Sequence, residues 1–478
     1  MIHYLFLSIY TLIILILGYK IWSNTKNIGF VLGILVLYYW SMLGSWFIVF
    51  DELTNQSGKE FGLAYYHYLE VLFPVHADNM YLKAIHFYGM FIIIIEAVIL
   101  FFVTKYHKKN KLDKPPSNFS VYISHKWLIV ICFACVLMSL GLIVNEIFIA
   151  AKTNNSIYYI TRTQQGRFFT IHQLLNQAAI TALFVGMVTF ISKENAIFLK
   201  GSLKKKYLYF YFLAAFVVEA YLLMIGNKKE IFFGGIFGIL VYLKNVNFKY
   251  NLKWLAVFVV IIALPLIFND GFRSYSPKFL VEVFDLSTID DEIKIKEVSY
   301  TAFTAKNTVF RFLFSNEMFV PHFSMYGIIS HDVPFTYGTS LVSLGASVVP
   351  RVLWPNRPPG IYEYYAESVN ATEGTGYTIH HAAAWYLNFG IIGIIVGALI
   401  IGWIWFYFYK KSNQIENIKN TFFRIFFIIG FSAFVAQLPI LLRNGPEGYK
   451  ALMVEGIVLP TLIIYFAYLM PKILKFKK

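Results

Sequence analysis

The sequence has few cysteines and few charged residues, and both shortages restrict the class of protein that it can encode. Two of its 478 residues are cysteine and 14% are charged, compared with about 25% charged residues in soluble domains. Cys132 and Cys135 lie in one apolar run, so they exclude a disulfide framework, and we interpret them as small core residues. With 58% hydrophobic residues, the low charge excludes a soluble domain and indicates a polytopic membrane protein.

Motifs for metal and nucleotide binding are also missing. The sequence has no HExxH motif and no Asp-x-Asp pair beside a helix end, so we expect no metal ion and no other cofactor. No glycine-rich phosphate loop follows a strand, which argues against nucleotide binding. The net charge of +15 comes from lysines clustered in short loops, a pattern typical of membrane topology. We therefore expect membrane lipids as partners, and no nucleic acid.

Apolar runs long enough to cross a membrane recur along the chain. A transmembrane helix needs about 20 mostly apolar residues, and this rule predicts an all-α polytopic membrane protein with about 11 transmembrane helices. The predicted spans are 2–22, 28–50, 83–105, 126–150, 173–192, 207–226, 231–244, 254–269, 384–408, 421–441 and 451–470. They divide the chain into N-terminal membrane helices (1–269), a large outer loop (270–380) and C-terminal membrane helices (381–478). Apolar stretches in the loop predict that it is partly helical.

The lysines predict the orientation of these spans. All lysine-rich loops fall on one side if the N-terminus is outside and the C-terminus inside, which agrees with the positive-inside rule. The lysine-rich segments are 20–26, 105–126, 193–206, 244–253, 410–419 and 472–478. The first apolar run has no small-residue cleavage site, so we expect it to be retained as a span.

Arginine is scarce, and its distribution is opposite to that of lysine. Only Arg424 lies at an inner helix end, and seven of the eight arginines lie on the predicted outer side. The outer arginines are Arg162, Arg167, Arg273, Arg311, Arg351, Arg357 and Arg443. Because a guanidinium group stays charged and donates two parallel hydrogen bonds to phosphate, this distribution indicates an anionic substrate at the outer membrane surface.

Two of the outer arginines lie in the proline-rich segment 350–359. Arg351 and Arg357 flank Trp354, and four prolines stiffen the segment. A rigid loop with fixed guanidinium groups lowers the ordering cost of binding a diphosphate, so the segment is a candidate binding site. The alternative is an interfacial anchor that holds tryptophan and arginine at headgroup depth.

A histidine pair, His380 and His381, lies at the outer mouth of a predicted span. Histidine titrates near neutrality, so the pair is placed for proton transfer or for a hydrogen bond to phosphate. Gly390 and Gly393 follow and would allow close helix packing at the start of the span. The alternative is a polar helix cap beside a packing motif.

The remaining outer polar groups are weaker candidates. Arg162 and Arg167 belong to a short polar loop that is either an anion contact or a solvated turn. Arg443 either pairs with Glu447 or reaches a ligand.

The large loop offers carboxylates and aromatic rings. An acceptor hydroxyl can require a base, and the sequence leaves Glu363, Glu367 and Glu373 open as candidates. Aromatic rings near the histidine pair would offer surfaces for stacking of sugars: Tyr362, Tyr364, Tyr365 and Trp385.

These features together resemble the bacterial O-antigen polymerase (Wzy) family of oligosaccharide repeat-unit polymerases. The resemblance rests on the 350–359 segment, on His380 and His381 leading into Tyr386-Leu387-Asn388-Phe389-Gly390, and on a large outer loop late in the chain. The related O-antigen ligases carry a similar histidine–GxxG passage. The chain departs from the pattern because no arginine is followed by ten residues and a glycine, and lysines occupy the Gly226 turn.

The resemblance implies a metal-independent glycosyltransferase of the GT-C type in the bacterial inner membrane, with its active site facing the periplasm. It would move a growing glycan from its polyprenyl diphosphate onto the non-reducing end of an incoming lipid-linked repeat unit. The implied partners are this lipid-linked oligosaccharide and a chain-length regulator protein.

Within that hypothesis we expect His380, His381 and Arg351 to be catalytic, because fixed charges would stabilise the developing diphosphate. The expected substrate-binding residues are Arg273, Arg311, Arg357, Arg443, Arg162, Arg167, Glu363 and Tyr365. Two alternatives remain open. One is a flippase or exporter of lipid-linked oligosaccharide, to which Glu96, Glu146 and Glu219 in apolar runs would contribute. The other is an O-antigen ligase, which differs only in its acceptor.

Overall fold

The fold is almost entirely helical in the part of the chain that the structure describes. A computed structural model describes residues 2–54, 75–109, 120–153, 157, 160, 169–192, 195–202, 204–224, 228–247, 251–261, 319–347, 349, 354, 356, 360–370 and 378–475. The helices of the N-terminal half are α1 (Ile2–Thr25), α2 (Ile28–Tyr38), α3 (Gly44–Thr54), α5 (Asn79–Lys109), α6 (His125–Leu142), α7 (Val144–Thr153), α9 (Phe169–Ile191), α10 (Lys205–Met224) and α11 (Lys228–Asn245). A π-helix, η1 (Tyr39–Leu43), joins α2 to α3.

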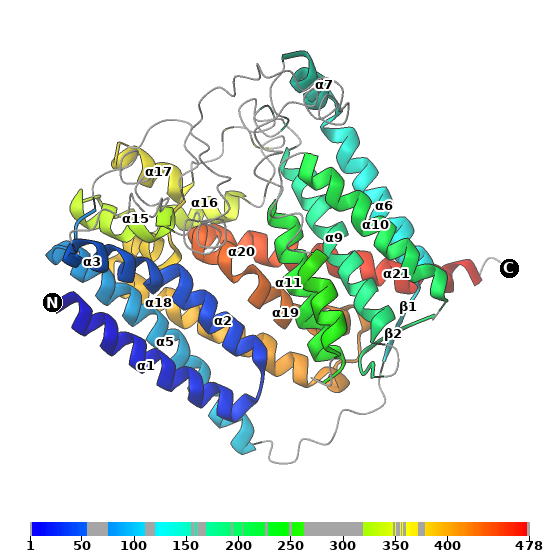
Figure 1. Cartoon of the computed structure of the whole chain (residues 1–478), viewed down its shortest axis with the longest axis horizontal. Helices are drawn as coiled ribbons and strands as arrows, with labels where there is room; N and C mark the ends of the chain where they lie inside the picture. The colour runs from blue at the N-terminus through cyan, green and yellow to red at the C-terminus, as the bar shows by residue number, and fades with distance from the viewer. Residues whose placement is uncertain are drawn as a thin grey trace.

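The C-terminal half begins with three helices from the predicted outer loop and continues with long apolar helices (Figure 1). The helices are α15 (Phe319–Ser330), α16 (Thr339–Ser347), α17 (Ile361–Ser368), α18 (His381–Asn413), α19 (Thr421–Arg443), α20 (Gly448–Lys450) and α21 (Leu459–Lys475). Short 3-10 turns, η3 (Ile415–Asn417) and η4 (Gly445–Glu447), and a π-helix, η5 (Ala451–Val458), connect them.

Eight helical segments are long and apolar enough to cross a membrane, so the chain is a multi-pass membrane protein. They are Ile2–Thr25, Ile28–Phe50, Asn79–Lys108, His125–Leu142, Ile171–Ile191, His381–Asn413, Thr421–Arg443 and Gly445–Leu474. Each overlaps a predicted span. The three other predicted spans coincide with α10, with α11 and with a short apolar helix, Leu252–Ile261, and their crossing of the membrane stays a prediction.

One predicted span is wrong in its extent. The run 126–150 is two helices, α6 and α7, because the chain leaves helical geometry at Ile143, with φ −117° and ψ 11°. Hydropathy alone does not reveal such a break, since both helices are apolar.

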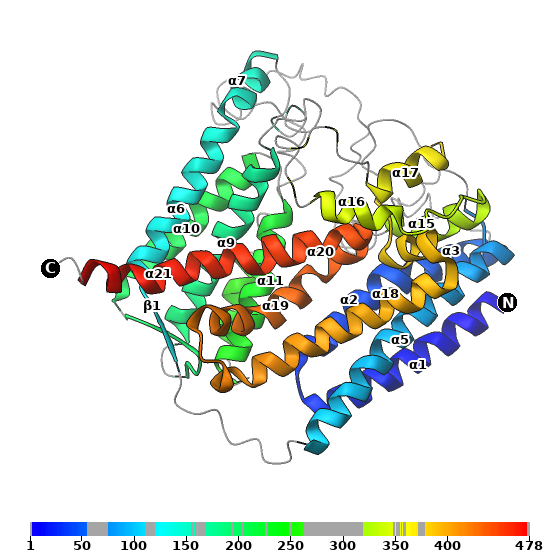
Figure 2. The same ribbon diagram turned by 180° about the vertical axis from the view of Figure 1, so that it is seen from behind.

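Two groups of helices lie on either side of α19 (Figures 1 and 2). In the first group α5 packs on both α1 and α18, and in the second α9 packs on both α6 and α11. α19 contacts members of both groups and runs antiparallel to the η5–α21 segment that follows it. The most buried span is therefore the one that joins the two halves of the bundle.

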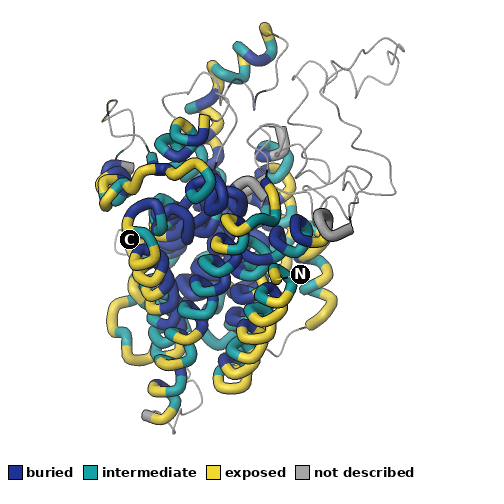
Figure 3. Tube along the Cα trace, turned by 90° about the vertical axis from the view of Figure 1, so that its left-hand side faces the viewer, coloured by how far each residue is buried: buried dark blue, intermediate teal, exposed yellow. Residues whose placement is uncertain are grey.

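Spans in the centre of the bundle are more buried than spans at its rim (Figure 3). In the most apolar part of α19, 94% of residues are buried, whereas the figure for α1 is 11%. α1 presents large apolar side chains outward, among them Leu12 and Leu15, which is expected for a helix at the rim of a membrane bundle.

Contacts gather four lysine-rich segments at one end of the bundle. Lys244 donates a hydrogen bond of 2.7 Å to Ser412 Oγ, which joins the C-terminal ends of α11 and α18. The Tyr409 hydroxyl lies 3.3 Å from His107 Nε2 and connects the end of α18 to the end of α5. The side of the membrane that this end faces stays a prediction.

A two-stranded parallel sheet covers the same end. β1 (Val121–Ile123) pairs with β2 (Leu199–Gly201), with Val121 opposite Leu199. Asn245 at the end of α11 accepts hydrogen bonds from the Phe198 and Leu199 backbone amides at 2.9 and 3.0 Å. The sheet thereby ties the loops before α6 and α10 to α11.

Candidate functional site

The opposite end of the bundle carries the predicted site, and contacts between distant segments bring its parts together. His3 Nε2 lies 2.9 Å from the Asp78 carbonyl oxygen, so α1 and α5 begin at this end. Ile379 and Asn444 form an isolated β-bridge, which joins the start of α18 to the end of α19. The helices α15, α16 and α17 lie over these termini (Figure 2).

His380 is the N-cap of α18 and is completely buried. Its Nδ1 accepts a hydrogen bond of 3.1 Å from the Ala382 amide, so the neutral ring carries its proton on Nε2. That Nε2–H donates to Ser41 Oγ at 3.0 Å. Burial, with His322 nearby, holds the pKa of His380 well below its ordinary value. His380 is therefore a neutral ring that fastens α18 to the preceding bundle.

His381 is also buried, and both of its ring nitrogens are used inside the protein. Leu441 is in the last turn of α19, where backbone carbonyls lack intrahelical partners, and its oxygen lies 3.1 Å from His381 Nδ1. A carbonyl only accepts, so Nδ1 carries the proton, and Nε2 accepts from Trp385 Nε1 at 2.9 Å. In this arrangement neither nitrogen is open to a substrate, and the ring caps α19.

A third histidine, His322 in α15, lies in the same cluster. Its Nε2 is 2.8 Å from the Tyr81 hydroxyl and 3.4 Å from Ser45 Oγ, and its ring stacks on Tyr88 at 5.1 Å. The Tyr88 hydroxyl donates to the His322 carbonyl at 2.6 Å. Burial lowers the pKa of His322 to about 3, against a smaller raising effect of the Ser41 backbone. The cluster thus holds His322 and His380 as neutral rings in a closed, aromatic environment.

The π-helix η1 makes room for this cluster. π-Helical turns inside α-helices are frequent at functional sites because they change which side chains share a face. Ser41 in η1 meets His380, and Ser45, one turn on, meets His322. A Cβ added at Gly44 would lie 2.8 Å from His322 Cδ2, so only glycine admits the ring this close.

The first turns of α18 are separated from the rest of the helix by a sharp break. Phe389 (φ −142°, ψ 21°) and Gly390 (φ 61°, ψ −143°) are not helical. Twelve residues of straight helix would place Trp385 and Gly397 roughly 18 Å apart along the axis. A Cβ at Gly397 would instead lie 2.4 Å from Trp385 Cδ1, so the chain folds back at the break.

The segment between α15 and α16 satisfies the backbone that the break exposes. The Thr336 amide donates to the Leu387 carbonyl at 2.8 Å. Asn388 Oδ1 accepts from Thr336 Oγ1 at 3.0 Å and from Ser340 Oγ at 2.7 Å, and Nδ2 donates to the Ala384 carbonyl at 2.8 Å. Non-helical backbone at a membrane boundary is stable only when its polar groups are paired in this way.

Glu447 joins both flanks of the arginine-bearing segment to the end of α19. Its Oε1 accepts a hydrogen bond of 3.2 Å from the Ile361 amide, the first of α17. The same oxygen lies 3.5 Å from Ser343 Oγ in α16. A carboxylate at a helix N-terminus is favourable, which explains its position at α17.

The candidate residues in α17 have structural partners. Glu363 Oε2 accepts a hydrogen bond of 2.9 Å from the Gly360 amide, and Oε1 accepts one of 2.9 Å from the Tyr362 hydroxyl. Glu363 therefore caps α17. Tyr365 is buried in the same helix and belongs to the hydrophobic core under α17.

Arg443 is the last residue of α19 and is half-buried. A cation is favoured at a helix C-terminus, and Glu447 follows one turn later. Tyr449 packs edge-on against His381 with ring centroids 5.2 Å apart, and its buried hydroxyl has no hydrogen-bond partner among the described residues. Arg443 and Tyr449 thus flank the histidine helix.

The other candidates lie outside the described residues, so their positions stay predictions. They are Arg162, Arg167, Arg273, Arg311, Arg351, Arg357 and Glu373.

Sequence reasoning missed His322 and its partners Tyr81 and Tyr88. A signal existed, since Pro321-His322-Phe323-Ser324 places a histidine and a serine in an otherwise apolar run. The aromatic residues gave no signal, because tyrosines are abundant in the spans and only packing shows which ones meet.

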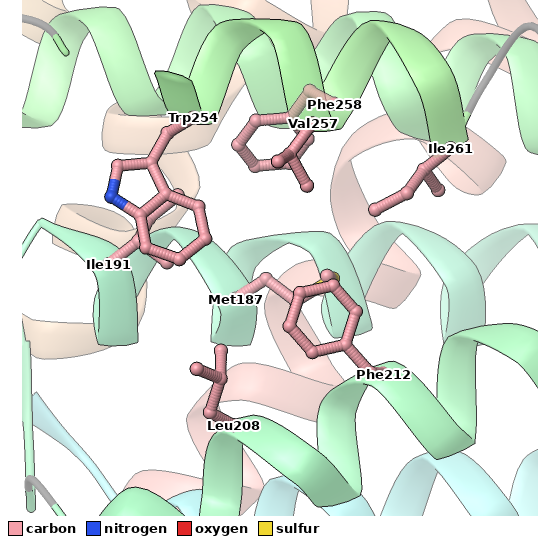
Figure 4. Close-up of a pocket in the computed structure, with 8 residues that line it drawn as sticks. All are labelled: Met187, Ile191, Leu208, Phe212, Trp254, Val257, Phe258 and Ile261. Carbon is pink, nitrogen blue, oxygen red and sulfur yellow. The ribbon is translucent and has the colours of Figure 1, made fainter.

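Away from this end, a void of about 10 Å³ lies between α9, α10 and the helix Leu252–Ile261 (Figure 4). Its lining is Met187, Ile191, Leu208, Phe212, Trp254, Val257, Phe258 and Ile261. None of these side chains can act as an acid, a base or a nucleophile. Within the described ranges, no group of three or more His, Cys, Asp or Glu side chains is placed to hold a metal ion.

Comparisons with known proteins give no relative for this chain. No protein-family model matches it, and neither a curated protein nor a solved structure matches it.

Proposed function

We propose that this membrane protein is a glycosyltransferase that polymerises polyprenyl-diphosphate-linked oligosaccharide repeat units at the outer face of the bacterial inner membrane. The observation that supports it most directly is the pair of contacts made by Glu447. Both flanks of the segment that contains Arg351 and Arg357 meet one carboxylate oxygen, four residues from Arg443.

These contacts limit how far the two arginines can lie from Arg443. Arg357 is four residues from Ile361, and four residues span at most about 14 Å. Arg351 is eight residues from Ser343, which allows at most about 28 Å. A tethered, proline-stiffened segment beside a third arginine is a suitable arrangement for binding a diphosphate.

The reaction would use these charges at the leaving group. The bond between the anomeric carbon and the diphosphate oxygen breaks, and its electron pair leaves with the diphosphate. A new bond forms to the acceptor hydroxyl oxygen, whose proton passes to a carboxylate or to the departing diphosphate. Fixed guanidinium groups stabilise the charge that develops in the transition state.

In this proposal the histidines act as positioning residues. His380 and His381 hold the start of α18 against Ser41 and Leu441, and their ring nitrogens are engaged there. They would keep the end of α19, with Arg443, in a fixed place close to Ser343 and Ile361, which flank the arginine segment.

The test is an assay with purified protein and a synthetic polyprenyl-diphosphate repeat unit, without added metal. The wild-type protein should give a ladder of products on a gel. Arg351→Ala should abolish the ladder while the protein stays folded, and Glu447→Ala should weaken it by freeing the segment. Arg424→Ala, at the lysine-rich end, is the matched control and should keep the ladder. Normal chain length from Arg351→Ala would refute the assignment.

One observation favours transport of the same lipid as a second candidate. Glu96 in α5 is completely buried within a span, and neither carboxylate oxygen has a partner among the described residues. Ionisable groups at such positions are typical of transporters. No ladder, together with movement of the lipid-linked substrate across liposomes, would favour this candidate. A ligase would instead require a different acceptor.

A further inference from the structure

Several buried polar atoms in α9, α19 and α21 have no hydrogen-bond partner among the described residues. They are the side-chain oxygens of Gln177 (α9), Ser432 and Gln437 (α19) and Thr461 (α21). All four side chains are at most 3% exposed, and all belong to spans. A buried polar atom without a partner is rare in proteins and usually marks a place for water or a ligand.

Two of these side chains, Gln177 and Gln437, line one place in the bundle. A Cβ at Gly456 would lie 3.0 Å from Gln437 Cγ, so residues 437 and 456 face each other there. Ser432 and Thr461 lie five residues further inward, which is roughly 140° around a helix, so they belong to other faces. The two partnerless carboxamide oxygens therefore lie at one level, six residues below Arg443.

Gln177 lines the same place as Gln437. Its Nε2 donates to Thr181 Oγ1 at 3.1 Å, which leaves its Oε1 without a donor. Phe233 and Phe237 of α11 line the same place, together with small residues of α19. The full lining is Gln177, Thr181, Phe233, Phe237, Ala433, Ala436, Gln437 and Gly456.

The chemistry of the lining restricts the occupant. The lining holds no charged side chain, so a buried ion would be left without compensation. The missing partners are hydrogen-bond donors, because the two partnerless atoms in the lining are carboxamide oxygens, which only accept. A neutral hydroxyl group supplies such donors, and the phenyl rings offer apolar faces beside it.

The site is closed in this structure, since the side chains leave no space for a water molecule between them. Two features would allow it to open. The contacts include alanines and a glycine, which hold the helices together with little side-chain interlocking. η5 is an eight-residue π-helix, a form in which backbone hydrogen bonds are less regular than in an α-helix.

We propose that this contact, the α9–α19–η5 seam, is a binding site for neutral hydroxyl groups, supplied either by water or by a sugar, and that it opens within the membrane. The proposal does not depend on glycosyl transfer, because it rests on the partnerless atoms alone.

The test is the reaction of cysteines placed in the seam with a small neutral thiol reagent. The background would carry Cys132→Ala and Cys135→Ala. The probe is 2-hydroxyethyl methanethiosulfonate, which reacts with the thiolate that forms only where a thiol is hydrated. Gln437→Cys should be modified at least about tenfold faster than Leu438→Cys, a matched position one residue on that is completely buried against Gly33. Intact-protein mass spectrometry measures the rates.

Gln177→Cys, on α9 in the same lining, is the second probe if Gln437→Cys does not fold. Equal, slow modification of the seam and control cysteines would overturn the proposal. A second arm adds the synthetic lipid-linked repeat unit before the reagent. Protection of the cysteine identifies a sugar hydroxyl as the occupant, and unchanged rapid modification identifies water.

Discussion

At the scale of single residues, the outer end of the bundle depends on histidines that are hydrogen-bonded as neutral rings. His381 connects two helices because it donates to the Leu441 carbonyl and accepts from Trp385. Each of these partners is buried, so each depends on the imidazole to satisfy it. The pair of histidines in the sequence therefore has a structural explanation beside the chemical one.

Replacement of His381 by alanine is expected to destabilise the protein. Two buried polar groups lose their partner, at about 1–3 kcal/mol each. Trp385→Phe removes one of these groups, so the double variant should lose less stability than the sum of the single variants. Unfolding followed in detergent would measure the three free energies. Strictly additive losses would contradict the bridging role.

Acidification should destabilise the protein through His322 and His380. Burial lowers the pKa of His322 to about 3 and holds that of His380 well below its ordinary value, whereas both titrate near 6.5 when unfolded. Below pH 6.5 the unfolded state binds more protons than the folded state. The contribution of the two neutral histidines to the free energy of unfolding is complete above pH 6.5. It is lost as the pH falls, by up to about 1.4 kcal/mol per pH unit for each histidine.

Melting temperatures at pH 7.5 and pH 5 would measure this dependence. His322→Asn should reduce the difference between the two values, and His331→Gln, at an exposed position, should leave it unchanged. A wild-type melting temperature that does not change with pH would contradict the neutral histidine cluster.

At the scale of secondary-structure elements, the break in α18 determines how the outer helices meet the bundle. It exposes the Leu387 carbonyl to Thr336 and turns Asn388 toward Ser340. α16, which leads into the arginine segment, is thereby fastened to the helix that carries both histidines. The break depends on Gly390, whose φ of 61° and ψ of −143° strongly favour glycine.

Gly390→Ala is expected to destabilise the protein by about 1–3 kcal/mol, because the new side chain occupies a strained backbone region. Gly345→Ala is the matched control. It lies in α16, nothing lies within 4 Å of its Cβ position, and alanine favours helix there by about 0.5–1 kcal/mol. Thermal unfolding of both variants in detergent gives the comparison. An unaffected Gly390→Ala protein would show that the break is not required.

Hydropathy was sufficient to predict eight spans, because length and apolar content are properties of each segment alone. It could not predict the breaks at Ile143 and Gly390, since both lie in apolar runs that read as continuous. The glycines of the 390–393 passage were interpreted as packing residues. Gly393 does pack closely, as a Cβ there would lie 1.9 Å from the Trp385 carbonyl oxygen, but Gly390 is a turning point.

At the scale of the whole molecule, sequence patterns predicted which residues share an end, and they could not predict which ones touch. Glu447 was considered only as a partner of Arg443, and the structure adds contacts with Ser343 and Ile361, which are 104 and 86 residues away in the sequence. The place of His322 in the site was missed because it also depends on contacts with residues far away in the sequence. Contacts between distant segments depend on helix packing, and periodicity within one segment carries no information about them.

The grouping of the lysine-rich loops at one end leads to a prediction about the whole chain in its membrane. Lys244 with Ser412, and His107 with Tyr409, hold together the helix ends from which these loops start. Since short basic loops stay in the cytoplasm, this end should face inward and the histidine end outward.

Thr339→Cys at the outer end should react with a membrane-impermeant maleimide in intact cells. Asn417→Cys should react only after permeabilisation. Both positions are exposed, and the wild-type protein, with Cys132 and Cys135 in a span, gives the background. The reverse labelling pattern would show the opposite orientation in the membrane. The arginine segment would then face the cytoplasm, where the proposed periplasmic chemistry could not occur.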